Sequence, residues 1–217
     1  MSDTARARSF QTGDSRLAGA ALLAAAAASI VLMAHHPTNA SPTLLPPVHG
    51  ALLVVLCVHT LGLLYLCAAR GFLRLPVLAG VIGYGVSLFG NMGAGLLNGF
   101  VTPRLLAQGP QIASPDILAF AWAADQSLAT MAVFGAGAAS ILWGLDFLRD
   151  ASKQSRLVGL AGILAGVVPS GLLLAGIIEM DVVGAFVSYS IQSAWAVLVG
   201  WLLLTGRAGR PDSSASA

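Results

Sequence analysis

The chain is poor in charge. Only 9% of its 217 residues are charged, whereas a soluble domain usually has about 25%. At the same time, 57% of the residues are hydrophobic and the mean hydropathy is +0.83. Such a chain has too few polar side chains to cover a globule in water. The composition therefore excludes an ordinary soluble domain and predicts a polytopic membrane protein solvated mainly by lipid.

Cysteine and the common catalytic motifs are also scarce. The two cysteines, Cys57 and Cys67, lie ten residues apart in one apolar run. A helix would separate them by about 15 Å, which is too far for a disulfide. The motifs of serine hydrolases, phosphate-binding loops, zinc proteases and dithiol redox proteins are absent. The basic residues are scattered, so the sequence carries no nucleic-acid footprint.

Six apolar runs long enough to span a bilayer follow one another along the chain. A membrane helix needs about 20 residues, and segments rich in Pro, Gly and polar residues separate these runs. We predict an all-α integral membrane protein with one six-helix transmembrane domain over 16–205 and short disordered tails over 1–15 and 206–217. The runs are Leu17–Ala34, Val48–Ala69, Leu75–Phe100, Ile117–Leu145, Leu157–Ile178 and Val182–Leu204.

Basic residues are concentrated in every second loop. With a cytoplasmic N-terminus, ten of the eleven basic residues face the cytoplasm and only Arg104 faces outward. Cytoplasmic loops are normally the basic ones, so both termini are predicted to be cytoplasmic, in what we expect to be a bacterial inner membrane. As an alternative, the first run could be a cleaved signal peptide, although its length favours a retained helix.

Polar side chains from four of the predicted helices share one depth. Counted at 1.5 Å per residue from the external end, they lie about 12–16 Å deep, near the middle of a hydrocarbon core about 30 Å thick. Polar residues are also more frequent in the outer half, where Tyr189 lies. We therefore predict a ligand pocket that opens to the external side. Its candidate lining residues are His59, Asn91, Asp125, Gln126, Tyr189 and Gln192.

Asp125 is the strongest reason to assign a function to this layer. A charged aspartate at a helix centre costs on the order of 2.5–3.5 kcal/mol, and no predicted span contains a lysine or arginine to neutralise it. The carboxyl group must be protonated, hydrated or paired with His59. The alternative is a hydrogen-bond network that only holds helices together, with bonds of about 0.6 kcal/mol each.

The third run combines small and polar residues. An i, i+4 row of them lets neighbouring helices approach closely, and predicts a central helix that does not face lipid. Asn98, Gly99 and Pro103 are typical of a helix end. The row consists of Gly83, Ser87, Asn91, Gly95 and Gly99.

All four histidines fall between residues 35 and 59. His35, His36 and His49 lie at the external ends of two consecutive runs, where they could bind zinc or copper together with an acidic residue. A haem could be held by His36 and His49, or by His59 with a methionine such as Met92 or Met131. The spacing matches no established zinc signature.

Four functions remain open from the sequence. The first is binding or transport of a small molecule or ion in the outward-facing pocket. The second is a haem or metal protein, and the third an intramembrane isomerase-type enzyme with His59 and Asp125 as its acid–base pair. The fourth is a non-catalytic accessory subunit. The partners expected are the lipid bilayer and a small-molecule ligand, and oligomerisation is left open.

Overall fold

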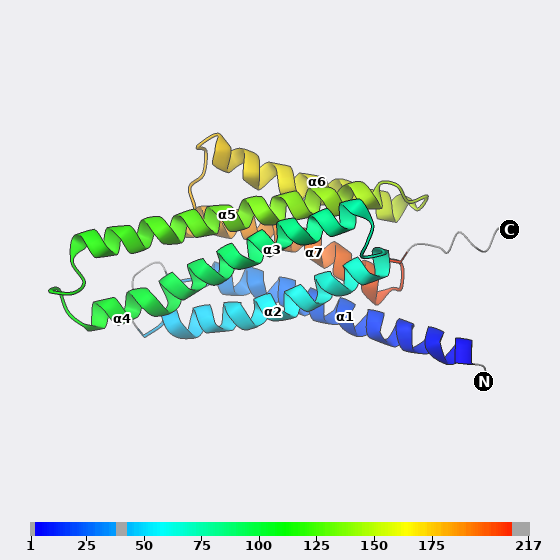
Figure 1. Cartoon of the computed structure of the whole chain (residues 1–217), viewed down its shortest axis with the longest axis horizontal. Helices are drawn as coiled ribbons and strands as arrows, with labels where there is room; N and C mark the ends of the chain where they lie inside the picture. The colour runs from blue at the N-terminus through cyan, green and yellow to red at the C-terminus, as the bar shows by residue number, and fades with distance from the viewer. Residues whose placement is uncertain (1–2, 38–42, 210–217) are drawn as a thin grey trace.

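The chain is described by a computed structural model that covers residues 3–37 and 43–209. Within these residues it contains helices and no strand, and six helical segments are long and apolar enough to cross a membrane. This confirms the predicted all-α, six-helix architecture. The main helices are α1 (Asp3–Ala34), α2 (Leu45–Arg70), α3 (Leu75–Leu96), α5 (Pro115–Phe147), α6 (Lys153–Leu174) and α7 (Val182–Leu204) (Figure 1).

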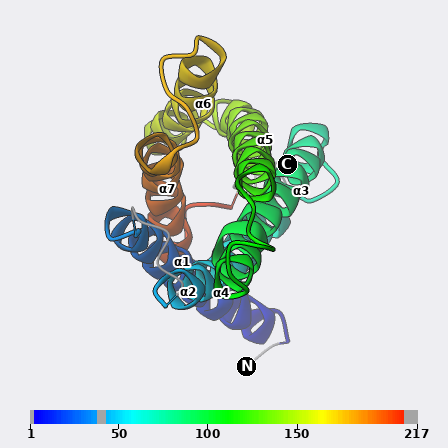
Figure 2. The ribbon, with the colours of Figure 1, turned by 90° about the vertical axis from the view of Figure 1, so that its left-hand side faces the viewer.

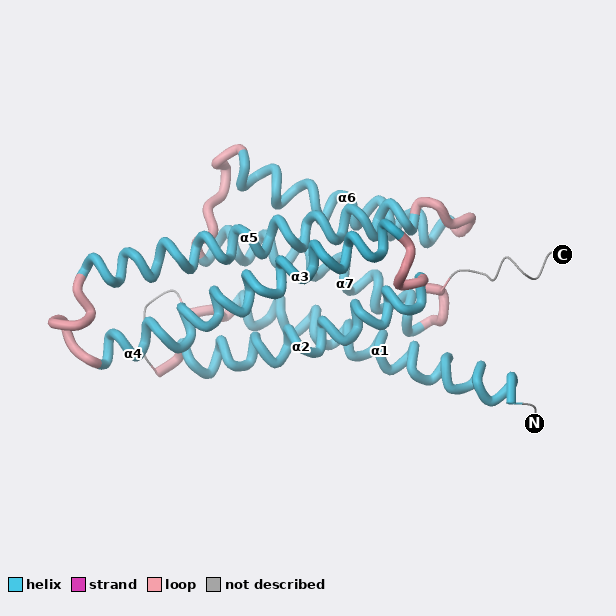
Figure 3. The backbone as a smooth tube through the Cα atoms, viewed as in Figure 1, coloured by secondary structure: helices cyan, strands magenta, loops and turns pink. Residues whose placement is uncertain are grey.

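The six helices form a closed ring in chain order. Each packs against the next, and α7 returns to α1. Figure 2, which looks along the bundle, shows this ring end-on. The loops gather at two ends (Figure 3). We call the end with segments 71–74 and 148–152 the basic end, and the end with His36 and segments 108–114 and 175–181 the histidine end.

Three helix pairs pack closely because glycine lies at their contacts. A Cβ atom added to Gly135 of α5 would lie 2.5 Å from the backbone nitrogen of Ser87 in α3. Gly144 of α5 and Gly159 of α6 face each other's backbone carbonyls, and Gly200 of α7 meets the Gly19 carbonyl of α1. Small residues give membrane helices this close approach, in which dispersion forces are strongest.

The third span continues past its predicted end. A π-helical turn, η1 (Leu97–Val101), follows α3 and leads into α4 (Thr102–Ala107). Pro103 lies in the first turn of α4, directly after the π turn. The prediction that Asn98, Gly99 and Pro103 end the helix is therefore wrong, because the wider π turn accommodates the proline.

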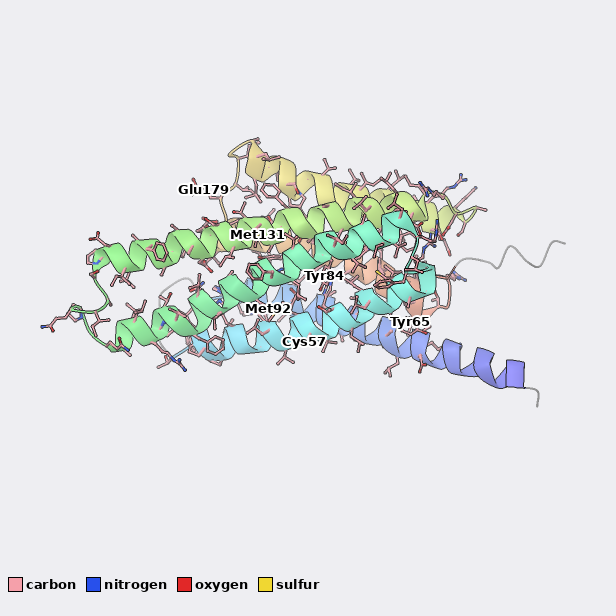
Figure 4. The ribbon with its side chains drawn as sticks, in the orientation of Figure 1. Cys57, Tyr65, Tyr84, Met92, Met131 and Glu179 are labelled. Carbon is pink, nitrogen blue, oxygen red and sulfur yellow. The ribbon has the colours of Figure 1, made fainter. Side chains whose placement is uncertain are left out.

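The predicted central position of the third helix is right for one face only. In a ring no helix is enclosed on all sides, and α3 packs between α2 and α5. Its outer face carries Ile82, Phe89 and Met92, which are more than half exposed. Figure 4 labels Met92, and also Cys57 on the exposed surface of α2. This outer face is the one a bilayer would cover.

The two predicted tails differ in how far the structure describes them. Helix α1 begins at Asp3, so the described part of the N-terminal tail, residues 3–15, is helical. The Ser15 hydroxyl donates to the Leu203 carbonyl of α7 at 2.8 Å, which anchors this part of α1 to the bundle. Of the C-terminal tail only 206–209 are described, and residues 210–217 lie outside the described residues.

Candidate binding cavity

A cavity of about 420 Å³ occupies the inside of the ring. It reaches the histidine end, where His36, Leu106 and Asp181 line it, and extends inward to Trp143 and Trp195. Most lining residues are apolar. All six pocket residues predicted from the sequence line this one cavity: His59, Asn91, Asp125, Gln126, Tyr189 and Gln192.

Asn91 and Gln192 are positioned by hydrogen bonds to the helices. The Asn91 amide nitrogen donates to the carbonyl and the hydroxyl of Ser87, at 3.1 and 3.2 Å. The Gln192 amide nitrogen donates to the Val133 carbonyl at 3.1 Å, joining α7 to α5. These bonds use the amide donors and leave the side-chain carbonyl oxygens as acceptors. Both residues therefore have a structural role as well as a place on the cavity wall.

Asp125 is buried and, within the part of the chain that the structure describes, has no cationic partner. Its side chain is beside the Gln126 amide, and the Tyr189 hydroxyl lies within its electrostatic range. Among the described residues the ion pairs all lie elsewhere, at the basic end. The pairing of Asp125 with His59 considered from the sequence is thus not formed in this structure, although both residues face the same cavity.

The imidazole ring of His59 is available to a ligand in the cavity. It is half-buried, and neither ring nitrogen makes a hydrogen bond within the described part of the chain. Tyr84 lines the same cavity, and its hydroxyl is 2.9 Å from that of Thr60. A neutral imidazole in such a place offers one donor and one acceptor to a ligand.

Two stacked tryptophans form the inner end of the cavity. The rings of Trp143 and Trp195 lie 6.0 Å apart at an interplanar angle of 16°. Each indole N–H donates to a backbone carbonyl, at Val77 and Val158 respectively, with lengths of 3.1 and 3.0 Å. The satisfied N–H groups hold both rings in place. We call this pair the tryptophan floor; sequence analysis did not identify it.

Glycines make room for the floor. A Cβ atom at Gly80 would collide with the Trp143 ring, and one at Gly162 would lie 2.7 Å from the Trp195 indole nitrogen. A tryptophan on one helix facing a glycine on another is a pattern that the sequence contains. Without knowing which helices are neighbours, however, the pairs could not be assigned.

A buried ion network closes the basic end behind the floor. The Arg70 guanidinium contacts Asp146 and Asp150, each at 2.6 Å, and Arg74 also contacts Asp146 at 2.6 Å. Arg70 also lies over the Phe147 ring, 4.3 Å from its centroid. The sequence patterns considered above do not predict this network. The sequence does contain a relevant pattern. Asp146 and Asp150 follow one span four residues apart, and Arg70 and Arg74 lie in a loop on the same predicted side of the membrane.

The three rim histidines do not form one site. His36 and His49 are paired, with their Nε2 atoms 3.3 Å apart. His35 is exposed, and its Nδ1 atom binds the Val31 carbonyl at 2.9 Å. In the described residues no group of three potential metal ligands exists. Partial burial lowers the pKa of His36, because the charged ring loses water, and its bond to the Pro37 carbonyl only partly offsets this.

The haem arrangements considered from the sequence do not fit this geometry. Two axial histidines must leave room for the porphyrin between them, whereas His36 and His49 touch edge to face with ring centroids 4.9 Å apart. Met92 is exposed on the outer surface of α3, and neither Met92 nor Met131 lines the cavity with His59. A sulfur ligand opposite His59 is therefore not in place.

Arg104 and Asp116 are simple surface charges. Both are exposed, and no ion pair joins them in the structure as described. Asp116 lies in the first turn of α5, where a negative charge complements the helix dipole. An interaction between the two residues is not needed to explain either one.

The chain has no counterpart in three comparisons with known proteins: no family model, no curated protein and no solved structure matches it.

Proposed function

We propose that the protein binds a small organic molecule in the cavity, and that this molecule carries a protonated amine on an apolar body. The observation that supports this most directly is Asp125, a buried acid on the wall of a mainly apolar cavity with no cationic partner among the described residues. A cationic ligand would supply the missing charge.

The size and chemistry of the cavity agree with this ligand class. Its volume of about 420 Å³ lies within the range of small-molecule sites, roughly 300–1,000 Å³. Trp122 lies one helical turn before Asp125 on the wall, and Tyr189 is near the same carboxyl group. Aromatic faces attract cations, so an ammonium at Asp125 would meet both a carboxylate and aromatic rings.

The route of entry follows from the predicted orientation. If the basic end faces the cytoplasm, the histidine end opens outward and the ligand enters from outside. Passage to the other side would require both the tryptophan floor and the Arg70 network to open. We therefore propose binding as the function, with transport as a further step that depends on this opening.

The test is a binding titration with lipophilic amines and their uncharged isosteres, monitored by the tryptophan fluorescence of the protein, since three of its four tryptophans line the cavity. We expect amines to bind more tightly. Since a hydrogen bond to a charged group contributes about 1.5–3 kcal/mol, Asp125→Asn should weaken amine binding by roughly 10–100-fold. The exposed Asp116→Asn is the matched control and should bind normally. Equal binding by Asp125→Asn and the unaltered protein would refute the proposal.

A further inference from the structure

His36 and His49 form a contact that sequence spacing does not explain. His36 follows α1, and His49 lies near the start of α2, where Gly99 gives its ring room. Their Nε2 atoms face each other at 3.3 Å and the ring planes are nearly perpendicular, at 84°. Both residues line the cavity at the histidine end.

The surroundings of the two Nδ1 atoms show which nitrogen of each ring carries the hydrogen. Nδ1 of His36 lies 3.0 Å from the Pro37 carbonyl, and Nδ1 of His49 lies 2.9 Å from the Leu45 carbonyl. A carbonyl oxygen only accepts, so each Nδ1 carries the hydrogen of its ring. In two neutral rings both Nε2 atoms then present lone pairs to each other. Two facing lone pairs repel, and a cation shared by the two nitrogens, either a proton or a metal ion, removes this repulsion.

The distance between the nitrogens distinguishes a metal ion from a proton. Tetrahedral Zn²⁺ with Zn–N bonds of about 2.0–2.1 Å places two nitrogen ligands roughly 3.3–3.4 Å apart. A shared proton makes a charge-assisted hydrogen bond, and those are shorter, about 2.7–2.9 Å. The observed distance of 3.3 Å between the two Nε2 atoms matches that expected for two ligands of a tetrahedral zinc ion. Metal-bound histidines also commonly donate their second N–H to a backbone carbonyl, as both do here.

We propose that His36 and His49 bind one tetrahedral transition-metal ion, best Zn²⁺, at the mouth of the cavity. The described residues supply no third histidine, cysteine or carboxylate close enough to join them. Two coordination positions are then left for water or for a donor atom of a molecule in the cavity. Structural zinc sites have four protein ligands and catalytic ones have three with one open position, so a site with two protein ligands has one open position more than a catalytic zinc site. This site does not depend on the amine ligand proposed above.

The experiment uses the full chain in detergent, carrying a purification tag without histidine and stripped of metal by a chelator. Zn²⁺ binding is measured by calorimetry and Co²⁺ binding by visible absorption. We expect one ion per chain and the intense Co²⁺ bands of tetrahedral coordination. Loss of even an outer partner weakens metal binding roughly 10–100-fold, so His36→Gln and His49→Gln should each bind at least tenfold more weakly.

His35→Gln is the matched control, because His35 is adjacent in sequence but exposed and bonded to Val31. It should bind zinc like the unaltered protein. Histidine acylation mapped by mass spectrometry gives a test that needs no variant: Zn²⁺ should protect His36 and His49 and leave His35 reactive. Absence of zinc binding, an octahedral Co²⁺ spectrum, equal effects of all three glutamine variants, or protection of His35 alone would overturn the proposal.

Discussion

The small-residue row of α3 changes its surroundings along its length. Gly83 and Ser87 contact Gly135 of α5 at the inner end. Asn91 lies on the cavity wall, and Gly95 and Gly99 then face Leu53 and His49 of α2. One row thus serves two helix contacts and the site between them.

The two asparagines of this segment also prove to be more alike than the sequence indicated. Asn98 was explained by a helix end, and Asn91 by the polar layer. Asn98 instead lies in the π turn, where the helix continues, and it lines the same cavity as Asn91. π turns are frequent at functional sites because they redirect side chains without ending the helix.

At the residue scale we predict that Gly135→Ala destabilises the bundle, whereas Gly85→Ala does not. The added methyl group at 135 would meet the backbone of α3 at 2.5 Å, and backbone cannot move aside as a side chain can. Gly85, also within a span, has nothing within 4 Å of its Cβ position. Overpacking typically costs about 1–3 kcal/mol, which should lower the melting temperature in detergent. Equal melting temperatures for both variants would contradict the close contact.

At the element scale, the Arg70 network joins the ends of helices that are far apart in sequence. Arg70 ends α2, Asp146 lies in the last turn of α5, and Arg70 also donates to the Ala208 carbonyl beyond α7 at 3.3 Å. The Arg156 guanidinium of α6 donates to the Asp150 carbonyl at 2.8 Å. Four helices are therefore tied together at the basic end, where the cavity is closed.

We predict that Arg70→Met strongly destabilises the fold. The change removes one of the two arginines that contact the buried Asp146 and breaks the contact between Arg70 and the buried Asp150, and removing one partner of a buried pair costs about 3–5 kcal/mol. Arg207→Met is the control, since Arg207 is exposed and, among the described residues, its guanidinium contacts Gln154 and the Trp201 ring. The free energy of unfolding in mixed micelles is the measurement. Similar small losses for both variants would show that the network contributes little.

At the scale of the whole molecule, the ring creates the cavity. The most extensive helix contacts pair α3 with α5, α5 with α6, α1 with α7, and α1 with α2. These leave two groups of closely packed helices, α3–α5–α6 and α7–α1–α2, facing each other across the cavity. The polar residues of the shared layer come from both groups: Asn91 and Asp125 from the first, and His59 and Gln192 from the second.

The orientation of this ring in the membrane is tested by cysteine labelling in whole cells. In a background where Cys57 and Cys67 are alanine, a membrane-impermeant maleimide should label Gln111→Cys, at the histidine end. It should not label Ala151→Cys, at the basic end, until the membrane is opened. Both positions are exposed in loops, so access alone decides the result. The reverse pattern would place the basic end outside and contradict the positive-inside prediction.

The sequence by itself determined the class of the protein and the depth of its polar residues. Hydropathy and span length specify six membrane helices because lipid admits few other structures. The fixed rise of a helix then gives His59, Asn91, Asp125 and Gln192 a common depth, and all four line one cavity.

Only the tertiary structure decided which helices are neighbours and therefore which side chains meet. His59 and Asp125 share a depth without forming a pair, whereas His36 and His49 meet at 3.3 Å and His35 turns away. The tryptophan floor and the Arg70 network depend on the same information. Lateral position follows from packing between helices, which for this chain is set by glycine contacts between segments distant in sequence, and no periodicity within one helix encodes the partner on another.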